Sequence, residues 1–364
     1  MKIIIDNIIF SLQKSGGISV YWYEILSRII NQTEINHIFV EEDVKETNIF
    51  RNKLKIDANN RIHSNFKINC ILNRYRNLDL NRRNEKFIFH SSYYRTLCKS
   101  VKKKNYVKEV VTIHDFTYER FIGGVKKWIH AWQKKKAIQS ADVVICISEN
   151  TKNDLLYFYP QFSNKDIRVI YNGVSEQYSI IPELKKENHS TPFFLFVGSR
   201  TTYKNFDFVV KAVSLVDGYF LKIVGGSLSK NELKLLQNYL SGRWQLIENI
   251  DNFELNVLYN QAFALMYPSS YEGFGIPIVE AMKAGCPFIS LKGSSITEVT
   301  GEAGFLMDEL NFDEFYNGVE LIKINRDKII ELGLLQADLF SWDKCYNEIV
   351  NIYKELNNKM MLNK

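Results

Sequence analysis

Short continuous apolar runs recur along the chain, and the intervals between them leave room for a helix. The first run is Lys2–Ile5, which is followed by a glycine turn and a helical pattern of apolar residues from Val20 to Ile29. A continuous apolar run is typical of a strand that is buried on both faces. Strands that alternate with helices predict a parallel sheet covered by helices on both sides. The chain is therefore predicted to have an α/β fold.

The runs form two series, which predict two domains. The first series continues with residues 87–89, 110–113, 143–147 and 169–171, and the second comprises residues 193–198, 221–225, 264–267 and 287–291. Between them, residues 175–192 lose the periodicity and contain prolines, as a connection does. The expected divisions are a first domain at residues 1–176, a linker at 177–192 and a second domain at 193–340. A final helix within residues 341–364 is expected to pack back on the first domain.

Residues 267–282 carry the strongest functional pattern, Tyr-Pro-Ser-Ser-Tyr-Glu-Gly-Phe-Gly-Ile-Pro-Ile-Val-Glu-Ala-Met. The pattern predicts a strand end, a glycine turn and a helix with Pro277 in its first turn. Glycines let the backbone approach a ligand closely, and the free N–H groups at a helix start favour an anion. The N–H groups concerned belong to Phe274, Gly275 and Ile276. A diphosphate fits this chemistry.

Two acidic residues flank this turn. Glu280 lies one turn into the predicted helix, where a carboxylate can accept hydrogen bonds from a ribose, and Glu272 precedes the turn and can reach another part of the ligand. The alternative is an ordinary helix start, at which the helix dipole favours acidic residues.

Arg200 and Lys204 follow the first run of the second series, four residues apart. Two cations on one side of a loop or helical turn would neutralise the charge that develops on a departing diphosphate. A solvated basic turn is the alternative. The chain has no Asp-x-Asp motif and no cysteine and histidine cluster, so no metal ion and no cofactor are expected.

The segment from Glu272 to Glu280, with Gly-Phe-Gly-Ile-Pro between them, resembles the E-x7-E segment of family-4 retaining glycosyltransferases. Other patterns of that family follow in its order: Ser15-Gly16-Gly17 before a helix, Thr112-Ile113-His114-Asp115, Ile147-Ser148-Glu149-Asn150-Thr151-Lys152, Tyr171-Asn172-Gly173-Val174, and Val197-Gly198-Ser199-Arg200 with Lys204-Asn205. The resemblance implies the GT-B architecture, in which two Rossmann-like domains with parallel sheets face a cleft. It also implies that the second domain holds most of a nucleotide-sugar donor.

The resemblance implies roles for individual residues. The expected catalytic residues are His114, Arg200, Lys204 and Glu272, with His114 beside the transferred sugar at the carboxyl end of a buried strand. The expected donor-binding residues are Gly17, Arg200, Lys204, Phe274, Gly275, Ile276 and Glu280. The expected acceptor-side residues are Gly16, His90, Tyr93 and Asp115. A structural His-Asp pair and an ordinary surface loop at residues 90–95 are the alternatives.

Positive charge is concentrated in one region of the chain. Residues 51–140 hold 22 Lys and Arg against 6 Asp and Glu, whereas the whole chain has a formal charge of only +6. Within this region, Lys126–Lys136 combines five lysines with Trp128 and Trp132, a pattern that favours a helix lying on an anionic membrane surface. A solvated helix whose tryptophans pack inward is the alternative.

We therefore expect a metal-independent retaining transfer of a hexose, mannose being the best candidate. The donor would be a nucleotide-diphosphate sugar and the acceptor a saccharide, lipid-linked, in surface polysaccharide or lipopolysaccharide assembly. No apolar run reaches the roughly 18 residues that a spanning helix needs, so a cytoplasmic location, with peripheral attachment to the inner membrane face, is expected. The alternatives are a nucleic-acid-binding protein that uses residues 51–140 and another GT-B sugar-phosphate enzyme, such as an epimerase.

Overall fold

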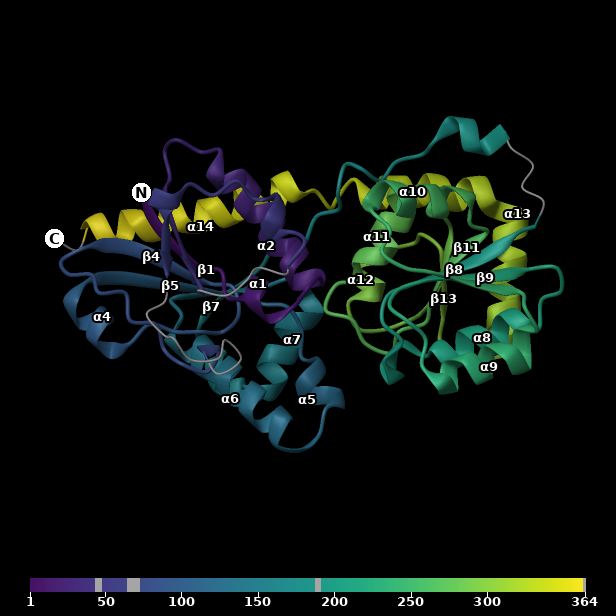
Figure 1. The fold of residues 1–364 in the computed structure, drawn as a ribbon, viewed down its shortest axis with the longest axis horizontal. Helices are drawn as coiled ribbons and strands as arrows, with labels where there is room; N and C mark the ends of the chain where they lie inside the picture. The colour runs from purple at the N-terminus through teal and green to yellow at the C-terminus, as the bar shows by residue number, and fades with distance from the viewer. Residues whose placement is uncertain (43–47, 64–72, 187–190, 363–364) are drawn as a thin grey trace. The chain divides into compact units, whose positions relative to one another are not determined.

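The chain folds into two compact units, shown by the computed structural model in Figure 1. The structure describes residues 1–42, 48–63, 73–186 and 191–362. Unit 1 comprises Met1–Asn172 and Trp342–Lys364, and unit 2 comprises Gly173–Ser341. The last helix therefore belongs to unit 1, and the described part of the expected linker, residues 177–192, belongs to unit 2.

Unit 1 is built on a parallel sheet with the strand order β3-β2-β1-β4-β5-β6-β7. Its strands are β1 (Lys2–Asp6), β2 (Asn36–Glu41), β3 (Arg61–His63), β4 (Lys86–Ser91), β5 (Tyr106–Ile113), β6 (Val143–Cys146) and β7 (Asp166–Val169). Its α-helices are α1 (Ile9–Leu12), α2 (Gly17–Ile30), α4 (Lys99–Lys104), α5 (Thr117–Phe121), α6 (Gly124–Ser140), α7 (Glu149–Phe158) and α14 (Trp342–Leu362). Short 3-10 turns lie at Arg51–Lys53, Ala58–Asn60 and Pro160–Phe162.

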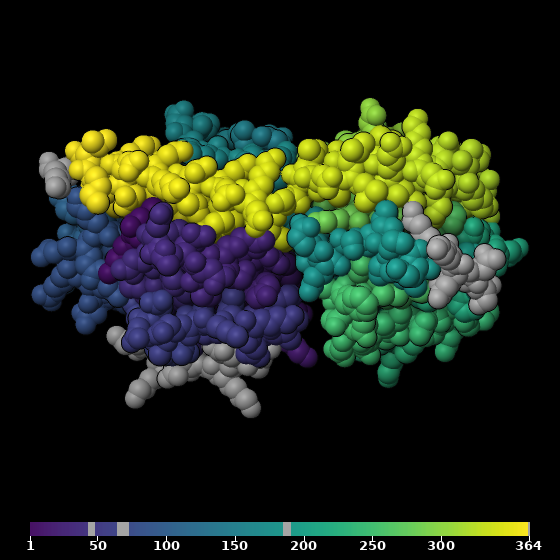
Figure 2. Space-filling model, turned by 90° about the horizontal axis from the view of Figure 1, so that it is seen from above, coloured from purple at the N-terminus to yellow at the C-terminus, as the bar shows by residue number. Residues whose placement is uncertain are grey.

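The C-terminal helix α14 completes the core of unit 1. Its buried residues, including Ile349 and Tyr353, recur every three or four positions and form one apolar face. This face joins the same hydrophobic cluster as Ile3 and Trp22. Figure 2 shows α14, in yellow, lying along the N-terminal segments in purple. The sheet of unit 1 is therefore covered by a helix that comes last in the sequence.

Unit 2 contains a second parallel sheet, with the order β10-β9-β8-β11-β12-β13. Its strands are β8 (Phe193–Val197), β9 (Phe220–Val224), β10 (Trp244–Ile247), β11 (Ala264–Tyr267), β12 (Phe288–Leu291) and β13 (Phe305–Met307). Its helices are α8 (Phe206–Ser214), α9 (Lys230–Leu240), α10 (Asn252–Gln261), α11 (Ile276–Lys283), α12 (Ile296–Thr300) and α13 (Phe312–Ala337), with 3-10 turns η4 (Pro182–Lys186) and η5 (Thr202–Lys204). Figure 1 shows α8 and α9 on one face of this sheet and α10 and α11 on the other.

The strand orders locate the place in each sheet where a ligand binds most readily. In unit 2, the chain proceeds from β8 outward to β10 and then returns to β11, so the order reverses between β8 and β11. In unit 1, the corresponding reversal lies between β1 and β4. Open α/β sheets bind ligands at the carboxyl ends of the strands beside such a reversal, because the flanking loops diverge there.

No helix in the described ranges has the length and apolar content that a membrane crossing requires.

Gly304, which precedes β13, gives a testable consequence of the packing in unit 2. Its φ of +72° favours glycine, and an added Cβ would lie 2.3 Å from the ring of Phe288. We expect Gly304→Ala to lower the free energy of unfolding by about 2–5 kcal/mol, because left-handed backbone strain adds to overpacking against a buried ring. Urea unfolding followed by circular dichroism measures the loss.

Gly242→Ala is the matched control. Gly242 has a φ of +87°, but an added Cβ would meet no atom within 4 Å. This variant should lose only the backbone part, about 1–2 kcal/mol. Equal losses in the two variants would show that the Phe288 contact contributes nothing.

Candidate functional site

Lys204 and Glu272 meet at the reversal point of the unit 2 sheet. Lys204 ends η5 after β8, and Glu272 lies in the loop after β11. The Lys204 Nζ donates hydrogen bonds to Glu272 Oε1 at 2.7 Å and to the hydroxyl of Tyr267 at 3.1 Å. Only 11% of the Lys204 side chain and 14% of the Glu272 side chain are exposed. The sequence-predicted cation and first glutamate are thus brought together in one largely dehydrated cluster.

The surroundings of Lys204 keep its ammonium charged. Burial alone would lower the pKa of Lys204, but the adjacent Tyr267 hydroxyl and Glu272 carboxylate outweigh that effect and raise it above its ordinary value. Burial also raises the pKa of Tyr267, so this phenol stays neutral near neutral pH. A positive charge held in a site of low effective dielectric interacts strongly with an incoming anion. The sequence analysis did not predict a role for Tyr267, although a position at the end of a buried strand is typical of site residues.

The backbone of Glu272 is fixed by the loop that follows β12. The Glu272 N–H donates to Ser294 Oγ at 3.1 Å, and the Ser295 hydroxyl donates to the Glu272 carbonyl at 2.9 Å. The Glu272 backbone is therefore held at both its N–H and its carbonyl group, which fixes the position from which the side chain extends.

The helix α11 begins where the glycine turn ends. Gly275 is its N-cap, with a φ of +94° that favours glycine, and an added Cβ would also lie 2.8 Å from Ile296 Cδ1. Pro277 occupies the first turn. The Phe274 ring is buried and packs edge-to-face on Phe340 at 5.4 Å. Phe274 can therefore offer a ligand its backbone but not its side chain.

Glu280, which is expected to bind a ribose, already has two tyrosine partners. The Tyr259 hydroxyl donates to Glu280 Oε2 at 3.0 Å, and the Tyr178 hydroxyl also hydrogen-bonds the carboxylate. Burial raises the pKa of Glu280 to about 7, and the two tyrosine hydrogen bonds oppose that rise. The sequence did not identify either tyrosine, because Tyr178 and Tyr259 lie far from Glu280 along the chain.

Arg200 makes a separate set of contacts. Its Nε donates to Glu232 Oε1 at 2.8 Å, and its Nη2 donates to the carbonyls of Gly226 and Ser227, both at 2.8 Å. Glu232 also belongs to the capping box that starts α9. The Nη1 atom is buried and has no hydrogen-bond partner within the described residues. The structure therefore pairs Lys204 with Glu272 and Arg200 with Glu232, whereas the sequence suggested one pair of cations.

In unit 1, His114 directly follows β5. One nitrogen of its ring is buried without a hydrogen-bond partner among the described residues. Only 6% of the residue is exposed, and its ring packs edge-to-face on Tyr21 at 4.9 Å. Within the described ranges, its Nε2 has no hydrogen-bond partner. Burial, assisted by the nearby charge of Lys134, lowers the pKa of His114 to about 3. The imidazole is therefore neutral at physiological pH, and Nε2 can bond a ligand hydroxyl.

A buried ion pair holds the loop after His114. Lys134 is 0% exposed, and its Nζ donates to the Asp115 carbonyl at 2.7 Å and to Glu119 Oε2 at 2.8 Å. The Asp115 carboxylate accepts from the N–H of Thr117, the first residue of α5, at 3.1 Å. Lys134 was expected among the surface cations of Lys126–Lys136, and that expectation is wrong because this side chain points into the protein.

The other predicted residues of unit 1 differ in their surroundings. His90 is 0% exposed, with Nδ1 2.6 Å from the Tyr353 hydroxyl and Nε2 2.9 Å from Thr112 Oγ1. His90 therefore lies in the core under α14, where protein side chains already contact both of its ring nitrogens. This corrects its acceptor-side assignment. The Tyr93 hydroxyl contacts Arg74 Nη2 and His130 Nε2, each at 2.8 Å.

Gly16 and Gly17 begin α2 after β1. The Gly16 carbonyl accepts from the Ser19 hydroxyl at 2.8 Å. Gly17 is the first helical residue, and a Cβ there would meet no atom within 4 Å. Space therefore remains beside Gly17 at the start of α2.

The outer face of α6 exposes large apolar side chains. Trp128 is 70% exposed, Trp132 is 45% exposed and Val125 is 72% exposed. Lys126 and Lys135 are exposed on the same helix. The tryptophans thus face outward from unit 1, and the inward packing considered as an alternative is not observed.

Two family models match successive parts of the chain. Residues 15–178 match the family described as Glycosyltransferase Family 4, and residues 179–332 match Glycosyl transferases group 1. The two matches meet close to the division between units 1 and 2. Together they account for most of the chain.

Individual proteins are similar over shorter stretches. The O-antigen chain mannosyltransferase B of Escherichia coli is 36% identical over 129 residues, which cover 31% of this chain and 34% of that protein. The O-antigen chain mannosyltransferase RfbU of Salmonella typhimurium is 32% identical over 190 residues, which cover 50% of this chain and 51% of that protein. The matched stretches thus span a third to a half of these relatives' own lengths.

The fold has close counterparts among solved structures. A sucrose-phosphate synthase from Thermosynechococcus elongatus superposes with a TM-score of 0.77, at 16% identity, covering 98% of this chain and 99% of that one. The expected α/β GT-B fold, with two parallel sheets, is confirmed.

The raised pKa of Glu280 predicts a pH-dependent stability in the absence of ligand. A carboxyl whose pKa is about 7 in the folded state and 4.5 when unperturbed stabilises the fold below pH 4.5, and this contribution is lost as the pH rises through 7. Glu280→Gln removes the titration. Relative to the unaltered chain, the free energy of unfolding of the variant should therefore rise by up to about 3 kcal/mol between pH 5 and pH 8. Its melting temperature should rise relative to that of the unaltered chain over the same pH range. Scanning calorimetry at the two pH values measures the difference.

The control is Glu302→Gln, which alters an exposed carboxylate of unit 2. Its stability relative to the unaltered chain should not change between the two pH values. A Glu280→Gln variant that behaves like this control would show that Glu280 is ionised at little cost in the folded protein.

Proposed function

The chain belongs to the family-4 GT-B glycosyltransferases, and we propose that it moves a hexose, with mannose foremost, from a nucleotide-diphosphate sugar to a saccharide acceptor. The observation that carries this proposal is the Lys204–Glu272 pair, held 2.7 Å apart at the reversal point of the unit 2 sheet. The similarity to two proteins named as O-antigen chain mannosyltransferases supports mannose as the sugar and surface polysaccharide as the product.

The proposed reaction breaks the bond between the anomeric carbon of the sugar and the donor phosphate oxygen. The departing nucleoside diphosphate takes the electron pair, and Lys204 with the N–H groups at the start of α11 stabilises its charge. The acceptor hydroxyl bonds to the anomeric carbon from the face that the phosphate leaves, so the configuration is retained. Its proton passes to the departing phosphate. These groups supply the neutralising charge, and the proposed transfer therefore needs no metal ion.

Lys204 and Glu272 are proposed to change partners when the donor binds. In the structure, each charge of the pair is compensated by the other. A diphosphate offers more negative charge than one carboxylate, so Lys204 turns toward the phosphates and Glu272 becomes available to the sugar hydroxyls. Glu280, between Tyr259 and Tyr178, is proposed to accept from the ribose. The neutral His114 is proposed to bond a sugar hydroxyl through Nε2.

The exposed face of α6 supports a setting at a membrane. Trp128, Trp132 and Val125 supply the apolar contact, and Lys126, Lys127 and Lys135 supply positive charge at or near the same surface. Such a combination binds the interface of an anionic leaflet. A lipid-linked acceptor is therefore proposed, with peripheral attachment of unit 1. A nucleic-acid partner is less favoured, because exposed tryptophans among lysines suit a lipid interface better than a phosphate backbone.

The transfer proposal is tested with Lys204→Ala. We expect kcat/KM for the donor to fall about 100–1000-fold, because a preorganised cation at the leaving group is lost. Radiolabelled or mass-spectrometric detection of the product measures the rate. The control is Lys292→Ala, which removes a lysine from an exposed ion pair with Asp308 in the same unit. Full activity of Lys204→Ala would show that the donor site lies elsewhere.

The membrane proposal is tested with the triple variant Lys126→Gln, Lys127→Gln and Lys135→Gln. Each lysine near an anionic surface contributes about 1 kcal/mol, so vesicle binding should weaken tenfold or more. Co-sedimentation with phosphatidylglycerol vesicles at low salt measures the binding. A triple variant of exposed lysines in unit 2, Lys230→Gln, Lys234→Gln and Lys328→Gln, carries the same charge change and should bind as the unaltered chain does. Equal losses in the two triple variants would refute the role of α6.

A further inference from the structure

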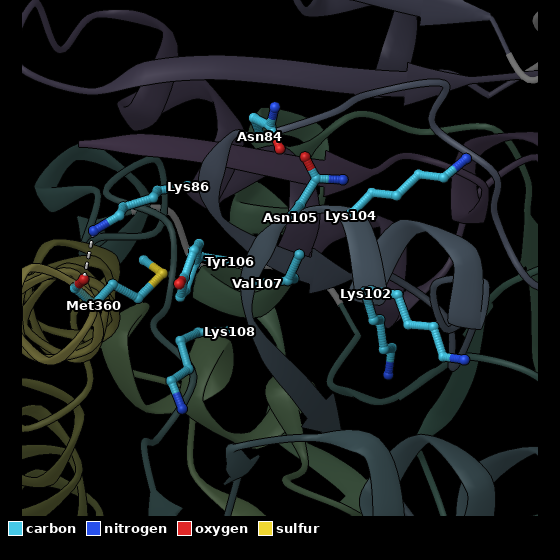
Figure 3. A pocket seen from close by; sticks show the side chains of 10 residues that line it. Asn84, Lys86, Lys102, Lys104, Asn105, Tyr106, Val107, Lys108 and Met360 are labelled. Carbon is cyan, nitrogen blue, oxygen red and sulfur yellow. Dashed lines mark hydrogen bonds between the residues drawn. The ribbon is translucent and has the colours of Figure 1, made fainter. Parts of the chain in front are cut away.

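A lysine-rich cavity of about 650 Å³ lies at the amino edge of the unit 1 sheet. It opens beside the first residues of β4 and β5, next to the end of α14 (Figure 3). Among the residues that the structure describes, five lysines line it, Lys86, Lys102, Lys103, Lys104 and Lys108, and no acidic residue does. His114 follows the opposite end of β5, about 25 Å away at the usual rise per strand residue. The cavity is therefore distinct from the proposed transfer site.

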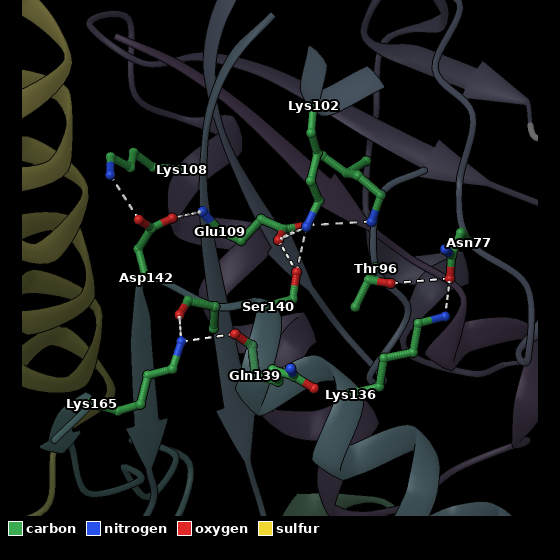
Figure 4. Close-up of polar contacts among 12 residues, drawn as sticks. Asn77, Thr96, Lys102, Lys108, Glu109, Lys136, Gln139, Ser140, Asp142 and Lys165 are labelled. Atoms are coloured by element: carbon green, nitrogen blue, oxygen red, sulfur yellow. Dashed lines mark hydrogen bonds and ion pairs between the residues drawn. The ribbon is translucent and has the colours of Figure 1, made fainter. Parts of the chain in front are cut away.

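Two of the five lysines have acidic partners. Lys102 forms an ion pair with Glu109 and also contacts the Ser140 hydroxyl, and Lys108 pairs with Asp142 at 2.7 Å (Figure 4). Both carboxylates lie outside the cavity lining. These pairs fix the two side chains and cancel most of their charge.

The other three lysines keep their charge uncompensated. Lys86 Nζ donates to the carbonyl of Met360 at 2.9 Å, which is a neutral acceptor. Lys103 and Lys104 are exposed at the end of α4. Across the described ranges, none of these three forms an ion pair with an acidic side chain. Three positive charges around one cavity favour a ligand with more than one anionic group.

Tyr106 adds an aromatic surface to this charge. The residue is 60% exposed, although it begins the long strand β5. The Lys86 ammonium lies 5.3 Å from the centre of its ring, which fixes the ring by a cation–π contact. Figure 3 shows Lys86, Tyr106 and Met360 side by side at one end of the cavity. An exposed ring with an ammonium beside it suits a ligand that has an apolar ring face next to an anion.

We propose that this cavity binds a phosphorylated saccharide, with its phosphates near Lys86, Lys103 and Lys104 and its sugar ring on Tyr106. A hollow lined mainly by ammonium and amide groups provides donors for phosphates and hydroxyls. A membrane would favour a protruding apolar surface, as on α6, and a nucleotide base would favour a second apolar wall opposite Tyr106. The site would hold a phosphate-bearing sugar or glycan segment away from the reacting groups.

Calorimetric titration at low salt tests the proposal with glucose 1,6-bisphosphate and with inorganic pyrophosphate. The Lys204→Ala chain is used, so that the proposed donor site contributes little binding. We expect glucose 1,6-bisphosphate to bind at least several-fold more tightly than pyrophosphate. Tyr106→Ala should abolish that preference, and Tyr106→Phe should keep it, because only the ring is needed. The titration measures binding and requires no turnover, so its result can be interpreted even if the transfer proposal fails.

The lysines are tested in the same titration. The triple variant Lys86→Gln, Lys103→Gln and Lys104→Gln should weaken the binding of both ligands tenfold or more. The double variant Lys103→Gln and Lys104→Gln leaves the Lys86–Met360 bond in place and should weaken the binding of both ligands several-fold. The unit 2 triple variant at Lys230, Lys234 and Lys328 should bind as Lys204→Ala does. Equal binding of the two ligands, with no effect of Tyr106→Ala, would overturn the saccharide assignment. So would binding of phosphatidylglycerol vesicles or an oligonucleotide through these lysines without binding of the sugar bisphosphate.

Discussion

The contact between the Lys204 ammonium and the Glu272 carboxylate organises the candidate site of unit 2. Neither group lies within a strand or an α-helix, and each depends on the sheet for its place. The pairing of β8 with β11 brings the two loops together, and the loop after β12 fixes the backbone of Glu272. Because both side chains are largely buried, each requires the other as long as no ligand is present. A donor with two phosphates and several hydroxyls can satisfy both at once.

Unit 1 also contains a buried lysine, Lys134, but this lysine holds a loop of the protein in place. Lys134 is bonded to the Glu119 carboxylate and to the Asp115 carbonyl, and this pair holds the loop that follows His114. Burial, assisted by this positive charge, lowers the pKa of His114 and keeps its imidazole neutral. A neutral ring whose Nε2 has no hydrogen-bond partner in the described part of the chain can bond a hydroxyl without adding charge there. In unit 2 the buried lysine is thus proposed to bind a ligand, whereas in unit 1 the buried lysine supports a loop of the protein itself.

The sequence predicted those parts of the molecule that rest on local patterns. Continuous apolar runs located most central strands, and glycine with proline located the start of α11. β13, with three residues, and β10, whose sequence is Trp-Gln-Leu-Ile, were not predicted, because a short or interrupted apolar run does not stand out from a loop. Side-chain partners were also missed. Whether His90 faces a ligand or α14, and whether Arg200 pairs with Glu232, depends on packing between segments that are distant in the sequence.

The proposed roles of Lys204 and Glu272 are tested most directly by the binding of the donor, and of the nucleoside diphosphate derived from it, to the Glu272→Gln variant. A panel of GDP, UDP, dTDP and ADP, each with and without its sugar, would be titrated by calorimetry in the presence of EDTA. If Lys204 holds the diphosphate and Glu272 the sugar, the variant binds the preferred nucleoside diphosphate as tightly as the unaltered chain does, or more tightly. It then loses only the extra affinity that the sugar provides. A variant that loses affinity equally for both ligands, or for neither, would contradict this division between the two residues.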